Sequence, residues 1–162
     1  MIVTRALTNL RLDPNAAKAA RLDRLGDEYM FVLQCYCRHL FGEVTGGGTI
    51  DKMRKNLPPL LTPLSARWKR CAWRQACGVM RSWFSNGRDR DDSDEPSFPG
   101  VTIQASVNVV TAQKAVNATR FGWWLRVSTL AKGEVQRVPF DLHPYAEKVL
   151  AEAVASGGKL CG

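Results

Sequence analysis

The side chains with the clearest potential for chemistry are the arginines and tryptophans of residues 65–85. At 100° per residue, four arginines share one helical face: Arg67, Arg70, Arg74 and Arg81. Five apolar residues share the opposite face: Trp68, Ala72, Ala76, Val79 and Trp83. Trp73 lies on the border between them. Because guanidinium groups and aromatic rings suit phosphates and unstacked bases, the pattern predicts a helix that binds nucleic acid, with Trp73 as a stacking residue.

Basic residues outside this helix extend the same prediction. From Lys52 to Arg88 the chain has nine basic residues and no acidic one. Three of them lie in the preceding loop, from which they can reach a phosphate: Lys52, Arg54 and Lys55. Lys132 and Arg137 lie near the turn of a predicted hairpin and are two further candidates for nucleic-acid contact.

The charge of the whole chain favours a polyanionic partner. The 162 residues carry a net charge of +8, although residues 87–96 hold five acidic residues against two arginines. This local charge of −3 leaves +11 for the rest of the chain. A basic surface of this kind is typical of proteins that bind nucleic acid.

Patterns for catalysis or metal binding are not found in the sequence. His39 and His143 have no partner spacing typical of a catalytic triad, and we interpret them as surface or capping residues. The cysteines do not match zinc-finger spacing and are interpreted as buried, reduced thiols: Cys35, Cys37, Cys71, Cys77 and Cys161. We therefore expect a chain that is not an enzyme on its own and that uses no cofactor.

No segment of the sequence predicts export or membrane insertion. The first residues, MIVTRALTNLRL, lack the apolar core of a signal peptide. No run of about 18 apolar residues occurs. We expect a cytoplasmic protein with no membrane partner.

A strand and a long helix are predicted at the start of the chain. Weak alternation predicts the strand over Ile2–Leu12. Asp13 as cap and Pro14 as first residue predict the start of the helix, and Gly42 its end. Six apolar residues form its predicted buried stripe: Leu22, Leu25, Tyr29, Leu33, Tyr36 and Leu40.

Two connectors flank the arginine-bearing helix. Residues 44–63, with a glycine triplet and three prolines, are predicted to form a flexible loop. Ser65 is the predicted N-cap of the helix. Residues 87–99 are charged and proline-containing, which predicts an exposed linker.

After the second connector the apolar period changes from 3.6 to 2. Alternation over 101–109 predicts a strand, and Lys132-Gly133 predicts the turn of a β-hairpin over Phe121–Phe140. His143-Pro144 predicts the start of a helix over Tyr145–Ala155, which Gly157-Gly158 ends.

This order of elements predicts an α+β chain in which helices are inserted into a β-barrel or β-sheet. The predicted parts are a first sheet segment over residues 1–12, a helical insertion with its linker over 13–96, and a second sheet segment over 97–162. We expect the N-terminal strand to pair with the later strands.

Two strings resemble the N-terminal half of the transposon-encoded TnpB proteins and the related type V CRISPR effectors. CAWRQACGVMRSWFS, residues 71–85, is similar to that family's second recognition-lobe helix. FGWWLRVSTLAKGEVQRVPFDLHPYAEKVL, residues 121–150, is similar to its wedge-domain hairpin. The resemblance covers roughly residues 1–155. It implies a wedge-type sheet or barrel with an inserted recognition lobe.

Members of this family are RNA-guided nucleases, so the resemblance also implies partners. Their wedge and recognition lobe hold a guide RNA and the guide–target heteroduplex, while a separate RuvC domain cuts DNA. No carboxylate here matches a RuvC motif, and the sequence ends at Gly162, where the family continues. We therefore expect a non-catalytic subunit or a nuclease-free relative. Its expected partners are a guide RNA (crRNA or transposon-derived RNA), target DNA, and a second chain with RuvC and the last wedge strands.

Two other functions remain open from the residues. In the first, an assembly or regulatory protein docks an acidic partner on the basic helix and accepts a strand at its sheet. In the second, the chain is a stand-alone DNA-binding regulator. The connector of about 20 residues between the helices is far longer than the 3–4 residues of a helix-turn-helix, so the second function ranks last.

Overall fold

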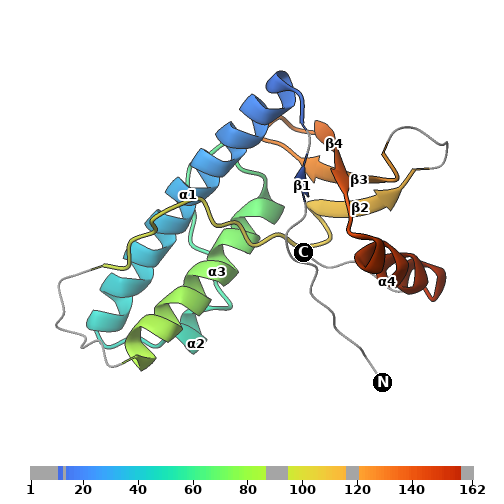
Figure 1. The fold of residues 1–162 in the computed structure, drawn as a ribbon. Helices are drawn as coiled ribbons and strands as arrows, with labels where there is room; N and C mark the ends of the chain where they lie inside the picture. Colours follow the sequence, from blue (N-terminus) through green and yellow to red (C-terminus); the bar gives the residue numbers. More distant parts are fainter. Residues whose placement is uncertain (1–10, 13, 87–94, 116–120, 158–162) are drawn as a thin grey trace. The chain divides into compact units, whose positions relative to one another are not determined.

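The computed structural model describes residues 11–12, 14–86, 95–115 and 121–157 (Figure 1). The chain divides into two compact units, which are described separately. The helical unit comprises 22–105 and 130–132, and the sheet unit comprises 1–21, 106–129 and 133–162. The boundaries at 21 and 105 lie later in the chain than the predicted boundaries at 12 and 96.

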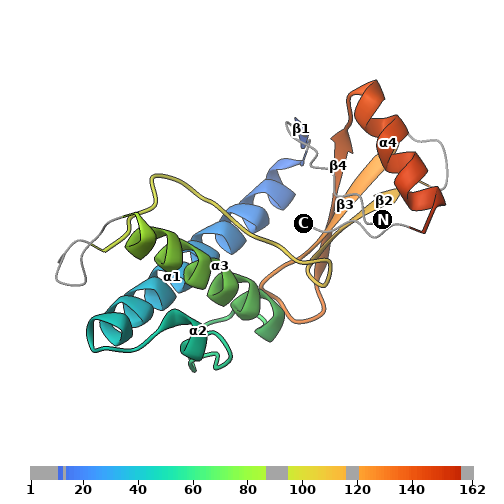
Figure 2. The same cartoon turned by 90° about the horizontal axis from the view of Figure 1, so that it is seen from below.

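The helical unit is built on two long helices, α1 (Ala16–Thr45), which begins in the sheet unit, and α3 (Ala66–Ser85). Ring pairs join them along their length: Tyr29–Trp68, Tyr36–Trp73, His39–Trp73 and Phe41–Phe84. Because the partners advance together along both helices, α1 and α3 run parallel, as Figure 2 also shows. The predicted buried stripe of α1 is confirmed from Leu25 to Leu40, whereas Leu22 is half-buried.

Parallel packing requires the chain to return between the two helices. The return runs over residues 46–65, where the loop prediction is corrected by a short helix, α2 (Ile50–Met53). A four-residue helix carries too little sequence for a 3.6-residue period to be visible. Near the end of the return, the Thr62 hydroxyl donates to Glu28 of α1 at 2.5 Å.

Both ends of α1 differ from the prediction. The helix begins at Ala16, because the Asn15 side chain accepts from the Lys18 backbone N–H at 3.0 Å, so Pro14 precedes the helix. Asp13 lies outside the described residues. The helix passes Gly42 and ends at Thr45.

The glycine triplet closes α1. Gly47 has φ +95°, and its N–H donates to the Val44 carbonyl, while the Gly48 N–H donates to the Glu43 carbonyl. These two bonds form a Schellman cap, which needs a left-handed residue at this position. At the start of α3, Ser65 is confirmed as N-cap, since its hydroxyl accepts from the Trp68 N–H at 3.3 Å.

A second return segment, residues 95–105, runs back along α1. Glu95 pairs with Arg38 at 3.1 Å, and the Pro96 carbonyl accepts from Gln34 at 3.3 Å. The exposed-linker prediction is wrong at Pro96, which is buried, whereas Ser97 and Pro99 are exposed as predicted; residues 87–94 lie outside the described residues.

The predicted strand over 101–109 is wrong, although the backbone there is held in place. Gln75 of α3, only 4% exposed, donates to the Thr102 carbonyl and accepts from the Gln104 N–H. The Tyr29 hydroxyl donates to the same Gln75 oxygen at 2.7 Å. Side chains of the helices thus take the place of a partner strand, so period-2 alternation occurs here without a sheet.

The sheet unit contains an open antiparallel sheet in the order β1-β4-β3-β2. Its strands are β1 (Arg11–Leu12), β2 (Val110–Lys114), β3 (Trp123–Ser128) and β4 (Val135–Asp141). The predicted hairpin is confirmed as β3–β4, with Gly133 at φ +80° in the turn. The described end of the N-terminal strand pairs with β4 as expected, and the rest of Ile2–Leu12 lies outside the described residues.

One face of the sheet forms the core of this unit with α4 (Pro144–Ala155). Trp123 of β3, Phe140 of β4 and Leu150 of α4 form a buried cluster. The predicted start of α4 is confirmed: Pro144 is its first residue, and the His143 ring nitrogen Nδ1 accepts from the Tyr145 N–H at 3.3 Å. Gly157, with φ +74°, follows the last turn; Gly158 is outside the described residues.

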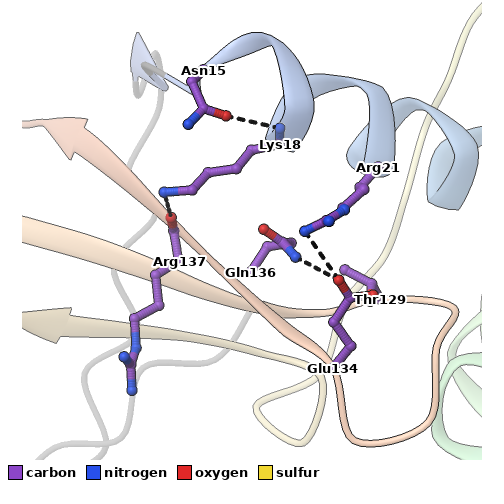
Figure 3. A network of polar contacts seen from close by, with 7 residues as sticks. All are labelled: Asn15, Lys18, Arg21, Thr129, Glu134, Gln136 and Arg137. Carbon is purple, nitrogen blue, oxygen red and sulfur yellow. Dashed lines mark hydrogen bonds and ion pairs between the residues drawn. The ribbon is translucent and has the colours of Figure 1, made fainter.

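The first turns of α1 contact the hairpin through polar side chains (Figure 3). The Glu134 carboxylate pairs with Arg21 at 3.1 Å and accepts from Gln136 at 2.9 Å and from the Thr129 hydroxyl at 2.7 Å. Lys18 donates to the Arg137 carbonyl at 2.7 Å.

With helices and an antiparallel sheet in separate segments, the described chain is α+β, as the sequence predicted.

Candidate nucleic-acid interface

The predicted arginine face of α3 is an exposed surface. All four of its arginines are exposed, whereas Trp68, Ala72 and Ala76 on the opposite face are buried. Within the described part of the chain, Arg70 and Arg74 form no ion pair. They lie one helical turn apart, and α3 contains no acidic residue. Two guanidinium groups are therefore available to an anion on this face.

Two contacts fix α2 and the residue after it beside α3. The Arg54 carbonyl accepts from the Trp73 indole N–H at 3.1 Å. Arg81 pairs with Asp51 of α2, an exposed pair whose contribution to stability is small. These contacts lie one before and one after the middle of α3, and α2 lies next to α3 in the ribbon (Figure 2).

This placement brings two predicted groups of basic residues together. Lys52, Arg54 and Lys55 are exposed on and after α2, in the segment that Trp73 and Arg81 hold against α3. In the sequence the two groups are separated by the connector that contains Pro58, Pro59 and Pro63. We name the combined surface the basic face, and its residues are Lys52, Arg54, Lys55, Arg67, Arg70, Arg74 and Arg81.

The burial of Trp73 contradicts its predicted role as a base-stacking residue. Its side chain is only 3% exposed, its ring lies edge-on to Tyr36 at 5.2 Å, and its indole N–H is bonded to Arg54. A ring enclosed in this way offers no face for a base to stack on. The helical wheel placed Trp73 on a border because it assumed one packing surface, whereas α3 packs against both α1 and α2.

The hairpin candidates lie in different parts of the fold. Lys132 is exposed in the turn, within the segment that belongs to the helical unit. Arg137 is exposed on β4 in the sheet unit, directly opposite Arg126 of β3. Like charges in opposite positions of an antiparallel pair destabilise a sheet. Because the strand register places Arg126 opposite Arg137, we add Arg126 to the candidate anion contacts, which the sequence prediction did not include.

An aromatic ring accompanies this second basic cluster. Trp124 lies on the same sheet face as Arg126, and it is half-buried. The Lys18 ammonium lies 5.7 Å from its ring centroid, which is a cation–π distance. This face thus places an aromatic ring among three basic residues, although it is smaller than the basic face of the helical unit.

The cysteines within the described residues are free thiols, and most are buried. Burial raises the pKa of the Cys37 thiol to about 12, with Cys77 and Glu95 adding smaller effects. Burial also raises the pKa of Cys77. Both thiols stay protonated at neutral pH, so neither is a thiolate nucleophile. In the described ranges no three His, Cys, Asp or Glu residues gather as a metal site. Cys161 lies outside them.

Comparisons of the chain with protein-family models, with curated proteins and with solved structures gave no match. Among the helices that the structure describes, none is both long and apolar enough to cross a membrane.

Proposed function

We propose that this chain is a non-catalytic, cytoplasmic subunit that binds a structured guide RNA and the guide–target heteroduplex. The observation that carries the proposal is the basic face, where Trp73 and Asp51 hold three basic residues of the α2 region beside the arginines of α3. Arg70 and Arg74 have no competing carboxylate among the described residues. Phosphates are the ligands that such a surface favours.

The basic face suits recognition of a nucleic-acid backbone and shape. It consists of long cationic side chains, and the neighbouring Trp73 is buried, so Trp73 offers no ring for base stacking at this surface. In RNA-guided systems, base pairing by the guide selects the sequence, and the protein contacts mainly phosphates. These features favour a wedge and recognition-lobe role, in which a second chain supplies RuvC and completes the open sheet.

The alternative partner is an acidic protein docked on the same face. A protein carboxylate and a phosphate both attract arginine, but only a nucleic acid presents phosphates at a regular spacing along a stiff duplex. The stand-alone helix-turn-helix regulator is disfavoured, because α1 and α3 run parallel and are joined by the return over residues 46–65.

A binding comparison tests the proposal. At about 50 mM salt, a fluorescent RNA hairpin and an RNA–DNA duplex of about 20 base pairs are titrated with the purified chain. Polyglutamate of matched charge is the competitor. We expect both nucleic acids to bind and polyglutamate to displace them poorly. Displacement by polyglutamate at equal charge concentration, or no binding of either nucleic acid, contradicts the proposal.

A further inference from the structure

A groove of about 450 Å³ lies in the helical unit between the end of α1 and the α2 region. The groove is shallow and largely open to solvent. Its apolar lining consists of Met53, Leu57 and Pro58, which are half-buried, and Pro59, which is exposed. The same short helix, α2, lines this groove and borders the basic face. The groove therefore lies next to the surface proposed to hold nucleic acid.

Four exposed polar side chains also line the groove: His39, Glu43, Lys52 and Asn56. His39 and Glu43 lie one turn apart on α1. Within the described residues, none of the four side chains forms a hydrogen bond or ion pair with the protein. Glu43 and Lys52 thus line the same groove without forming an ion pair. The Glu43 carboxylate can therefore accept hydrogen bonds from a ligand, and the Lys52 ammonium can pair with an anionic group.

We propose that this groove binds one unstacked guanine nucleotide, an inference that rests on the proposed function. The Glu43 carboxylate has two acceptor oxygens and no donor. Guanine is the base whose pairing edge presents two adjacent donors, the N1–H and the amino group. Unstacked bases of RNA are recognised in this manner, through their edges and through rings such as histidine.

The other lining groups complete the recognition of a nucleotide. His39 supplies an aromatic ring, and its contact with Trp73, at 6.2 Å between centroids, supports it from inside the fold. Lys52 supplies a cation for the phosphate, and Asn56 supplies an amide for the remaining base or sugar atoms. The nucleotide comes either from the bound RNA strand or from solution, since both present the same chemistry.

The two histidines of the chain make the test specific, because His39 lines the groove and His143 caps α4 in the sheet unit. Their ring-proton NMR signals are followed during titration with GMP, AMP, CMP and UMP. We expect GMP to shift the His39 signals saturably, with the His143 signals unchanged. The other nucleotides should bind about tenfold more weakly, the effect of one lost charge-assisted hydrogen bond.

A matched pair of variants separates recognition by Glu43 from general electrostatics. Glu43→Gln should weaken GMP binding about tenfold, although removal of a negative charge favours an anionic ligand. Asp27→Asn removes an equal charge at another exposed position of α1 and should leave GMP binding unchanged. Equal effects of the two variants would overturn the assignment of Glu43.

An RNA titration of the same variants keeps this inference distinct from the proposed function. If RNA binds, but GMP does not move His39 and Glu43→Gln leaves RNA affinity unchanged, the groove is not a nucleotide site and the proposed function stands. If GMP moves His39 in a chain that binds no RNA, the groove is a site for free nucleotides and the proposed function fails.

Discussion

Replacing Arg70 and Arg74 together by glutamate is expected to weaken RNA and heteroduplex binding by about 100-fold or more. Each arginine is expected to donate charge-assisted hydrogen bonds worth about 1.5–3 kcal/mol to a phosphate, and every 1.4 kcal/mol is a factor of ten. Reversal of the two charges adds repulsion from the phosphates. The measurement is the dissociation constant of a labelled duplex at fixed salt, compared with that of the unmodified chain.

The same double variant should keep its fold. Arg70 and Arg74 are exposed and form no ion pair within the described residues, so the thermal midpoint should change little. Arg24→Glu with Lys148→Glu is the matched control, since it makes the same charge change at exposed positions of α1 and α4. Equal loss of binding in both doubles would show that net charge, rather than the basic face, holds the nucleic acid.

Replacing Trp68 by alanine is expected to destabilise the helical unit by about 3–5 kcal/mol. The side chain is 1% exposed, and its ring packs edge-on against Tyr29 at 5.8 Å. Removal leaves a large cavity between α1 and α3, the two helices that position the basic face. Since domains are stable by only about 5–15 kcal/mol, this is a major loss. Urea unfolding followed by far-UV circular dichroism measures it.

An exposed aromatic residue on the same pair of helices provides the control for Trp68. Phe31 of α1 is 57% exposed, so Phe31→Ala should change the free energy of unfolding by no more than about 0.5 kcal/mol. Trp83, which the helical wheel placed with Trp68, is half-buried. The loss of unfolding free energy for Trp83→Ala should therefore lie between those of Trp68→Ala and Phe31→Ala. A loss at Trp68 no larger than at Phe31 would contradict the packing described for α1 and α3.

The elements with strong local signals were predictable from sequence. Ser65 marks the start of α3, a sustained period marks α1, and the Lys132-Gly133 turn fixes the hairpin. At the start of α1, three adjacent residues, Asp13, Pro14 and Asn15, each suit a helix start, and only the structure shows that Asn15 is the cap. Local rules rank such neighbours poorly, because Asp and Asn side chains can both accept from the orphan N–H groups, and proline suits the first helical position without needing a partner.

The parts that sequence missed depend on long-range contacts. The alternation over 101–109 is that of a strand, but Gln75 and Tyr29 take its backbone bonds, and no local pattern reveals such partners. Trp73 was misplaced because α2 covers it. For the site, the arginine face followed from the helical period alone. The position of the α2 residues next to α3 depends on the path of the return over 46–65, which no local pattern predicts.

The salt dependence of heteroduplex binding tests the central claim most directly. The logarithm of the binding constant is measured against the logarithm of salt concentration for the unmodified chain. The slope is about −0.9 for each phosphate contacted on B-DNA, and about −0.7 for single strands. With contacts from Arg70, Arg74 and the α2 residues, we predict a slope of about −3 to −5. A slope near zero, or no binding at low salt, would contradict a nucleic-acid role for the basic face.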